Sequence, residues 1–494
     1  MFLSVLNQIL TIQVILPILL GTIVGTIFGA VPGLTTVMGI ALLLPVTYYM
    51  SPMPAISMLL GVYCGGISGG LISAILLGIP GTPASIVTTF DGYPLAKKGK
   101  AGEALAVGIF VSFIGGMFSA VALSFLAPQL SRLVLRFGPF EYFALGVCGL
   151  SIVASLSKGN TLKGLIAASL GLCFALIGPD PVLGLSRFDF GLTQFAGGIS
   201  FIPALIGLFA VSQAFEDIQH LSHDSLNELN ERTFQFSDFC IPWKKIFDSW
   251  SNIIRSSVIG ILIGVLPGVG GPVASFLSYE QAKQTSKNKK DFGHGAIEGV
   301  IASETSNNAV TGGALSCLIS LGLPGDGATV ALLGGLMIHG LRPGPLFIVE
   351  RPDIVYGIFA AFFIANILVF VTQYWGIRVY AQILKVPTYI LIPIIFVMCL
   401  IGSYALNRQM FDVWMMVFFS LIGYAFRKLE YPLAPFILAF ILGPMVEANL
   451  RRAMSIYRGN FFSISRHPIA LILFAIGLMV IVLSFKKVGK GLKD

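Results

Sequence analysis

Apolar segments long enough to cross a lipid bilayer recur along the whole chain. A helix needs about 20 apolar residues, at about 1.5 Å of rise each, to cross about 30 Å of hydrocarbon. Only 11% of the 494 residues are charged and 55% are hydrophobic, so this chain cannot cover itself with polar surface. We therefore expect an all-α polytopic membrane protein with about 10 to 14 membrane segments. Candidate segments lie at 11–31, 104–127, 140–156, 162–178, 196–214, 252–267, 354–375, 389–403, 411–426, 433–446 and 467–485.

The charge pattern excludes other classes of protein. The net charge is +8, from 31 Lys and Arg against 23 Asp and Glu, and the basic residues lie in short clusters between apolar runs. Such clusters set the orientation of membrane segments and do not indicate nucleic-acid binding. A soluble enzyme and a disordered regulator are excluded by the same composition. The six cysteines are scattered without a CxxC pair, so neither disulfides nor a resident metal or cofactor is predicted.

One polar stretch divides the chain. Residues 215–250 form its most polar part and fall almost at its midpoint, as a linker between two bundles would. We predict a first membrane repeat at 1–214, this linker at 215–250, a second repeat at 251–450, and a C-terminal segment with a basic cytoplasmic tail at 451–494. The N-terminus has no basic region and no small-residue cleavage site, so its first apolar run is expected to be retained.

The two halves carry matched motifs in the same order. Gly29-Ala-Val-Pro-Gly33 corresponds to Gly264-Val-Leu-Pro-Gly268 at an offset of 235 residues. Leu77-Gly-Ile-Pro-Gly-Thr82 corresponds to Leu321-Gly-Leu-Pro-Gly-Asp326 at an offset of 244 residues. An internal repeat explains matched signals of this kind.

Charge then predicts the orientation of the repeats. The basic loop 95–103 follows the first central motif, whereas the basic segment 280–293 precedes the second. Positively charged loops favour the cytoplasmic side, so loops in opposite positions predict halves that are inverted relative to each other. Inverted repeats with broken helices or re-entrant hairpins at mid-membrane are typical of secondary transporters.

The two central Pro-Gly motifs are the first candidate site. Each motif should end one helix and begin another, which leaves free amides and carbonyls inside the protein. Free amides at a helix N-terminus bind anions, and neighbouring hydroxyl groups add donors. A kink that only serves packing is the alternative for each motif. The predicted substrate-binding residues are Ser68, Pro80, Gly81, Thr82, Pro83, Ser85, Asn307, Asn308, Gly325 and Thr329.

Acidic and amide side chains near the second motif are the candidate ion site. Glu304 either marks an ion or substrate path or begins a helix at the membrane interface. Asp326 lies in the second break, where it could bind Na⁺, relay a proton or only cap the next helix. The predicted residues for coupling to Na⁺ or H⁺ are Gly33, Gly268, Asn307, Asn308 and Asp326.

Two other functions remain as alternatives. Gly66-Ile-Ser68-Gly69 fits the GxSG pattern of intramembrane serine proteases, which need a membrane-embedded histidine, and only His339 lies against an apolar stretch in the core region. Runs of small residues more often allow close helix packing. The chain has no P-loop and no HExxH motif. A non-transporting membrane scaffold subunit is the second alternative.

The motifs resemble one known family. The run from Gly69 to Pro83 that continues to Asp91-Gly-Tyr-Pro94 resembles the large membrane subunit of tripartite tricarboxylate transporters. The similarity covers about residues 20–470, and its other motifs are Gly29-x-x-Pro-Gly-Leu34, Phe292-Gly-x-Gly-x-Ile-Glu-Gly-Val300, Asn307-Asn-Ala309, His339-Gly-Leu-x-Pro-Gly-Pro345, Leu442-Gly-Pro444, Glu447 and Arg451-Arg-Ala453.

The resemblance implies a transport function and partners. In that family a periplasmic solute-binding protein delivers a carboxylate to a large and a small membrane subunit in the bacterial cytoplasmic (inner) membrane. An ion gradient drives uptake, and the surrounding membrane lipid is the other partner expected. This chain departs from the family pattern at Gly78, Ser303 and Asp326, where Asn, Pro and a small residue are usual. Because these positions fall in the predicted site, citrate itself is not implied.

Overall fold

The computed structural model describes residues 9–155, 161–180, 184–219, 239–384 and 388–491. Most of them are helical, as expected for an all-α membrane protein, and six helices are long and apolar enough to cross a membrane. The chain forms two compact units, one of residues 1–131, 213–266 and 270–402 and one of residues 132–212, 267–269 and 403–494. The division at 215–250 predicted from the sequence remains a prediction, and its residues 220–238 lie outside the described residues.

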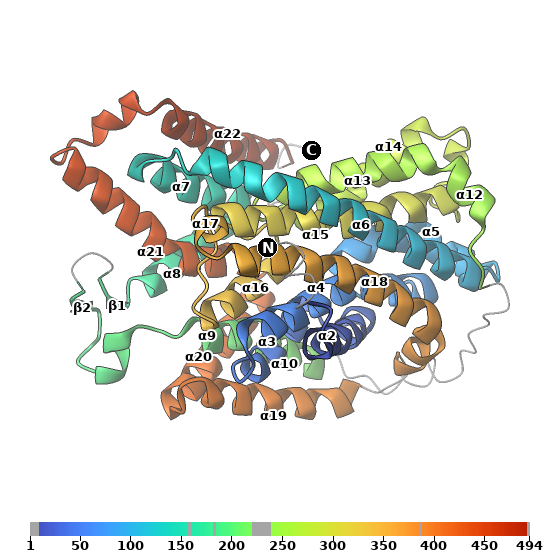
Figure 1. The fold of residues 1–494 in the computed structure, drawn as a ribbon, viewed down its shortest axis with the longest axis horizontal. Coiled ribbons are helices and arrows are strands. Elements are labelled where there is room, and N and C mark those ends of the chain that lie inside the picture. Colours follow the sequence, from blue (N-terminus) through green and yellow to red (C-terminus); the bar gives the residue numbers. More distant parts are fainter. Residues whose placement is uncertain (1–8, 156–160, 181–183, 220–238, 385–387, 492–494) are drawn as a thin grey trace. The chain divides into compact units, whose positions relative to one another are not determined.

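The first unit contains the two predicted helix breaks (Figure 1). Its helices before the polar stretch are α2 (Ile12–Ala30), α3 (Thr36–Thr47), α4 (Pro52–Leu77), η1 (Pro83–Ser85), α5 (Ile86–Lys97) and most of α6 (Ala101–Val134). Most of α10 (Ser212–Gln219) and α12 (Trp243–Asp248) lie in that stretch. They are followed by α13 (Trp250–Val265), α14 (Gly270–Thr285), η4 (Lys289–Asp291), α15 (Ile297–Leu321), α16 (Gly327–Ile338), α17 (Phe347–Glu350), α18 (Pro352–Ile383) and most of α19 (Thr388–Asn407).

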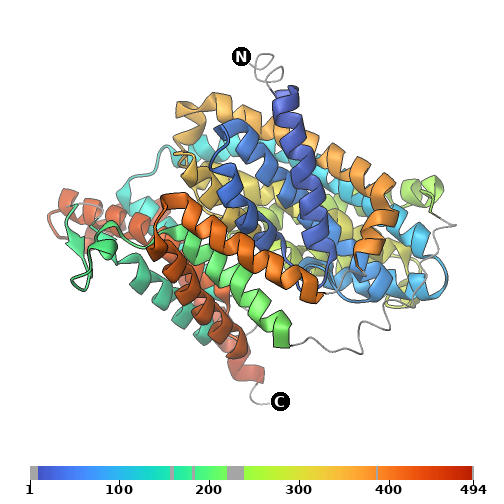
Figure 2. The ribbon, with the colours of Figure 1, turned by 90° about the horizontal axis from the view of Figure 1, so that it is seen from below.

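Glycines allow the central helices of this unit to pack closely. A Cβ atom on Gly25 of α2 would lie 2.3 Å from the Val62 carbonyl oxygen of α4. In the second half, a Cβ atom on Gly264 of α13 would lie 2.3 Å from the Val310 carbonyl oxygen of α15. Small residues at such contacts let helix backbones approach in a membrane, where lipid offers no hydrophobic drive for association. Figure 2 shows α2, in dark blue below the N-terminus, among the helices of its unit.

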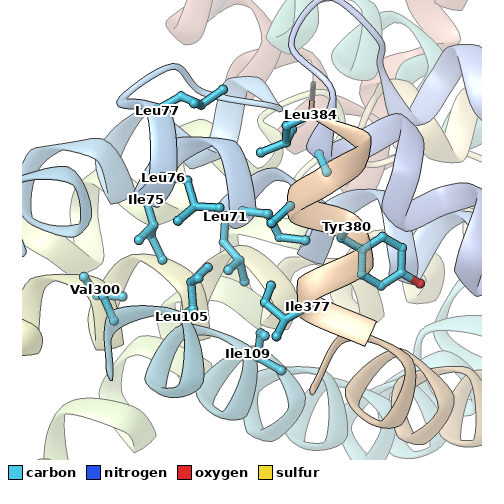
Figure 3. Packing of buried hydrophobic residues seen from close by; sticks show 14 of the residues in the cluster. Leu71, Ile75, Leu76, Leu77, Leu105, Ile109, Val300, Ile377, Tyr380 and Leu384 are labelled. Atoms are coloured by element: carbon cyan, nitrogen blue, oxygen red, sulfur yellow. The ribbon is translucent and has the colours of Figure 1, made fainter. Parts of the chain in front are cut away.

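An apolar cluster surrounds the C-terminal part of α4. Leu71 and Ile75 of α4 pack against Leu105 of α6, Val300 of α15 and Ile377 of α18 (Figure 3). Because this cluster joins helices from both halves of the sequence, it fixes α4 and α15 in one core. The broken helices are therefore held from several sides.

The two basic loops lie on the same side of this unit. Lys98 Nζ donates to the His294 carbonyl oxygen at 2.7 Å. Both loops also line a cavity of about 180 Å³, to which they contribute Leu95, Lys100, Asn288 and Asp291. Loops that occupy opposite positions in their repeats meet on one side if the halves are inverted. The inversion itself stays a prediction, because it also requires the orientation in the membrane.

In the second unit, ion pairs attach a short β-hairpin to a long helix. It contains α7 (Pro139–Ser155), α8 (Thr161–Ala175), η2 (Thr193–Gly197), α9 (Phe201–Leu205), the π-helix η3 (Ile206–Val211), α20 (Met410–Lys428), α21 (Leu433–Ile456), η5 (Phe461–Arg466) and α22 (Pro468–Gly491). Strands β1 (Gly178–Pro179) and β2 (Ser186–Arg187) pair antiparallel, with Gly178 opposite Arg187. Arg187 contacts both carboxylate oxygens of Glu447 at 2.6 Å, and Arg451 pairs with Asp180, so this hairpin is fixed to α21.

Candidate functional site

The first helix break lies between α4 and α5. Gly78 ends α4 in the left-handed region, at φ 71° and ψ 14°, which glycine adopts without steric cost. The chain then turns, and the next helical segment starts at Pro83. Ser85 closes this start, because its Oγ accepts from the Thr82 amide at 3.1 Å and donates to the Thr82 carbonyl at 2.8 Å. The predicted end and restart at Ile79–Ser85 are confirmed.

The second break repeats this geometry between α15 and α16. Gly322 ends α15 at φ 71° and ψ 14°, the same angles as Gly78. Asp326 then caps α16, since its Oδ1 accepts from the Thr329 amide at 2.7 Å and its own amide donates to Thr329 Oγ1 at 2.9 Å. The capping interpretation of Asp326 is therefore confirmed, and an additional role in coupling stays a prediction.

Each break packs against the other half of the sequence. The segment η1 packs against α14 and α15, whereas α16 packs against α3 and α4. Tyr63 of α4 donates from its hydroxyl to Asp326 Oδ2 at 2.7 Å. Asn307 of α15 donates to the Ile67 carbonyl oxygen of α4 at 3.3 Å. The two breaks therefore belong to one interlocked site.

Several buried oxygens near the first break have no partner among the described residues. They are Thr82 Oγ1, Asn307 Oδ1, Ser73 Oγ and Thr36 Oγ1. A Cβ atom on Gly81 would lie 2.6 Å from Ser73 Oγ and 2.1 Å from the Gly29 carbonyl oxygen. Buried polar atoms without partners are costly, and a bound ligand, ion or water would satisfy them.

Glu304 lies deep in α15 and not at a helix start. The helix begins at Ile297, and the Glu304 side chain is 0% exposed. Its carboxylate accepts from Thr88 of α5 and, at 3.2 Å, from Ser112 of α6. The interpretation of Glu304 as a residue that begins a helix at the interface is wrong, because two turns of helix precede it.

A second buried carboxylate fixes the loop before α15. Asp91 of α5 accepts from the amides of Gly293, Gly295 and Ala296, each at 2.8 Å, and from the Tyr279 hydroxyl at 2.9 Å. Burial and the nearby Asp91 charge raise the pKa of the Tyr279 phenol, which therefore keeps the proton that it donates. Amide donors stabilise a buried carboxylate strongly. Asp91 is thus a structural anchor between α5 and the 292–296 loop.

The other predicted site residues lie in contacts between or within helices or in the turns themselves. Ser68 of α4 donates to Gln373 Oε1 of α18 at 2.9 Å, which joins two helices. Asn308 donates to the Glu304 carbonyl of its own helix at 3.0 Å. Gly33 and Gly268 follow α2 and α13 with φ of 92° and 74°. Pro80, Pro83 and Gly325 form the two turns themselves, and a Cβ atom on Gly325 would lie 2.7 Å from the Gly264 carbonyl oxygen.

The structure does not bring Ser68 and His339 together. Along α16, Asp326 bonds Tyr63 of α4, and the later Gly335 lies against Leu59 of α4. The helix α16 therefore runs toward the start of α4, while Ser68 lies beyond Tyr63 in the other direction. Because α4 rises by about 1.5 Å per residue, His339 ends far from Ser68. A serine–histidine pair, which a protease requires, is not formed by these residues.

Sequence reasoning missed Tyr63, Thr88 and Ser112 as members of the site. Tyr63 and Asn307 are separated by the repeat offset of 244 residues, and so are Thr82 and Asp326. The repeat thus contained a signal for Tyr63, which stands where the other half has the polar Asn307. Thr88 and Ser112 gave no such signal, because hydroxyl residues are common in membrane helices.

Comparison with known proteins identifies a family and two relatives. Residues 15–438 match the family described as "Tripartite tricarboxylate transporter TctA family". A protein of Agrobacterium vitis described as "Uncharacterized 52.8 kDa protein in TAR-I ttuC' 3'region" is 36% identical over 463 residues, which cover 92% of this chain and 89% of that protein. Another, described as "Uncharacterized protein in TAR-II ttuC' 3'region", is 38% identical over 225 residues, which cover 46% of this chain and 93% of that protein. No solved structure matches the chain.

Proposed function

Because this chain belongs to the tripartite tricarboxylate transporter TctA family, we propose that it imports a small carboxylate as the large membrane subunit of a secondary transporter. The substrate is a tricarboxylate or dicarboxylate, and a Na⁺ or proton gradient drives its uptake. A periplasmic solute-binding protein delivers the substrate, and a small membrane subunit completes the complex. The site of action is the bacterial cytoplasmic (inner) membrane.

The interlocked pair of broken helices is the observation that supports this function. Broken helices at mid-membrane give transporters the free amides that bind anionic groups. At the first break Thr82 is 5% exposed and its hydroxyl has no partner among the described residues, so the hydroxyl is free to donate to a carboxylate. The restart at Pro83 leaves the Ala84 amide at this helix start, because Pro83 has no amide hydrogen and the Ser85 amide bonds the Thr82 carbonyl oxygen at 3.0 Å. We therefore assign the substrate carboxylate to the turn of Thr82 and Ser85.

The second break is better suited to a cation. Asp326 is a carboxylate among helix ends, and its negative charge is one that an anion site would avoid. Each of its carboxylate oxygens already has a donor, from Thr329 and from Tyr63, and each has further acceptor capacity. A bound Na⁺ or proton at Asp326 would offset that charge before the anion binds.

Reconstituted transport tests the proposal. The chain, its small subunit and its solute-binding protein are placed in proteoliposomes, and uptake of radiolabelled citrate, malate and succinate is measured under a Na⁺ gradient or a proton gradient. We expect accumulation of at least one carboxylate under at least one gradient, dependent on the binding protein. Absence of accumulation for every carboxylate, with correctly folded components, would contradict the proposed function.

A further inference from the structure

A chain of hydroxyl groups connects Glu304 to a backbone carbonyl. Thr88 Oγ1 bonds Glu304 Oε1 and lies 3.0 Å from Ser303 Oγ. Ser303 Oγ in turn donates to the Val300 carbonyl oxygen at 3.2 Å. Glu304, Thr88 and Ser303 are each 0% exposed, so these hydrogen bonds are shielded from bulk water.

No basic side chain of the described residues compensates the Glu304 charge. On the helices packed against α15, Tyr63 bonds Asp326, Asp91 bonds Tyr279 and Glu103 pairs with Lys245. Glu280 of α14 and Glu350 of α17 are themselves acidic and supply no counter-charge. Further basic groups on these helices are Arg255, which donates to the Ser251 carbonyl of its own helix, Lys97, which lies over the Tyr93 ring, and the partly exposed Lys283. A fully buried carboxylate without a counter-charge is costly as an anion.

The hydroxyl chain satisfies both protonation states of Glu304. When Glu304 is ionised, Thr88 and Ser112 donate to its two oxygens and Ser303 donates to Val300. When Glu304 carries a proton, that proton is donated to Thr88, and Thr88 turns its own hydrogen toward Ser303. Each hydroxyl has one hydrogen to donate and lone pairs to accept, so one hydroxyl rotation exchanges the two patterns. Neither state leaves a member of the chain unpaired.

We propose that Glu304 is a proton-binding site of this protein, with Thr88 and Ser303 as a hydrogen-bond relay: Thr88 accepts the hydrogen bond of the protonated acid and donates one to Ser303, while the proton stays on Glu304. The participating oxygens bond one another directly, so a proton is held among them without the further oxygen ligands that a metal cation needs. Neither Asp326 nor Thr82 takes part in these hydrogen bonds. The site adds a second acidic group, one that the predicted ion-coupling residues did not include.

Protonation of Glu304 also changes the attachment of the first hairpin. Thr88 belongs to α5, the arm that follows the first break, and Glu304 belongs to α15. A hydrogen bond to a carboxylate is about twice as strong as one between neutral groups. Binding of a proton therefore replaces one charge-assisted bond between α5 and α15 with two neutral ones, from Glu304 to Thr88 and from Thr88 to Ser303. This link to transport rests on the proposed function, whereas the proton site itself stands on the geometry.

Infrared spectroscopy on the purified full-length chain tests the site without transport. Difference spectra across a pH titration detect the band of a protonated carboxyl group. We expect a titrating band that remains in Asp326→Asn, the matched background, and disappears when Glu304→Gln is added to it. A band that persists in the double variant, or no titrating band in Asp326→Asn, would overturn the proposal. So would a Na⁺-dependent rise in melting temperature that requires Glu304 while no carboxyl band titrates.

Two single-hydroxyl variants test the relay and keep the acid in place. Ser303→Ala removes an acceptor that only the protonated state needs, so the midpoint of the band should move down by about one pH unit, or about tenfold in the protonation constant. Ser112→Ala removes a donor to the ionised state, so the midpoint should move up by about as much. Ser306→Ala, which loses only bonds to its own helix, should leave the midpoint unchanged. Shifts of equal sign for Ser303→Ala and Ser112→Ala would contradict the relay.

The outcomes for the site and for the transport function can be distinguished. If the band and its opposite shifts are observed but no carboxylate is accumulated, the proton site stands and the proposed function fails. If carboxylate uptake is normal in Glu304→Gln and the band is absent from the wild-type chain, the proposed function stands and the proton site fails.

Discussion

At the first helix break the residue before the restart is Thr82, and at the equivalent place in the second break it is Asp326. In each break the preceding helix ends at a glycine, Gly78 or Gly322, with φ 71° and ψ 14°. In each break a hydroxyl residue three positions later bonds back to Thr82 or to Asp326. Asp326 accepts a hydrogen bond at each carboxylate oxygen, from Thr329 and from Tyr63, whereas the Thr82 hydroxyl has no partner among the described residues.

The difference gives one backbone design two different electrostatic preferences. The shared turn provides helix ends whose amides favour anions. A neutral hydroxyl at this position keeps that preference, while a carboxylate opposes it and attracts a cation. We therefore expect the first break to bind the substrate carboxylate and the second to bind the coupling ion.

The largest effect is expected from adding one methyl group to either turn. In Gly81→Ala the new atom would lie 2.1 Å from the Gly29 carbonyl oxygen, and in Gly325→Ala it would lie 2.7 Å from that of Gly264. Overpacking of this kind costs about 1–3 kcal/mol or more, so uptake and thermal stability should both fall sharply. Gly327→Ala is the matched control, because its nearest contact is 3.4 Å away on Val37. Stable and active Gly81→Ala protein would show that the close approach at the first turn is not required.

Removal of the charge at the second break should have the next largest effect. Asn caps a helix about as well as Asp, so Asp326→Asn should fold normally. If Asp326 binds the coupling ion, gradient-driven accumulation should fall more than tenfold while solute exchange is retained. Accumulation and exchange are measured in the same proteoliposomes. Unchanged accumulation at every external Na⁺ concentration and pH would limit Asp326 to capping.

Removal of the free hydroxyl at the first break should weaken substrate binding. A hydrogen bond to a charged group contributes about 1.5–3 kcal/mol, so Thr82→Val should lower apparent affinity by about ten- to a hundredfold. Ser85→Ala should act in the same direction, because Ser85 holds the turn. Thr47→Val, which loses only a bond within its own helix, is the control for uptake and abundance. Normal affinity in the Thr82→Val, Ser85→Ala double variant would make the first break a packing kink.

The smallest effect is expected from cysteine substitutions that report orientation. Lys98 and Lys289 lie in the two basic loops, and both should resist an impermeant thiol reagent in intact cells if these loops face the cytoplasm. Uptake should change little in a background depleted of the six native cysteines. Labelling of one position from outside and not of the other would contradict the inverted repeats on which the comparison of the two breaks depends.

Much of the helical organisation could be predicted from the sequence. The segment predicted at 11–31 is α2, the one at 104–127 lies within α6, and the one at 433–446 lies within α21. Their positions follow from local composition, because a bilayer admits only long apolar helices with internally bonded backbones. The two Pro-Gly motifs were predicted as helix ends for a similarly local reason, since proline and glycine restrict the backbone wherever they occur.

The site was predicted only in part. Thr82, Ser85, Asp326 and Thr329 stand within the motifs themselves, so their positions at the breaks followed from the sequence. The environment of Glu304 did not, because Thr88 and Ser112 are separated from it by 216 and 192 residues in the chain. Nothing in the local sequence around a common threonine or serine indicates which distant carboxylate it will meet.

The sequence by itself therefore determined the membrane class, the positions of most helices and the two turns, because each depends on neighbouring residues and the bilayer. The tertiary structure alone decided which side chains face one another across the halves: Tyr63 with Asp326, and Thr88 with Glu304. Such pairs depend on the relative placement of whole helices, which is fixed by glycine contacts and apolar packing distributed over the core. The bonding of a buried carboxylate is a property of that placement.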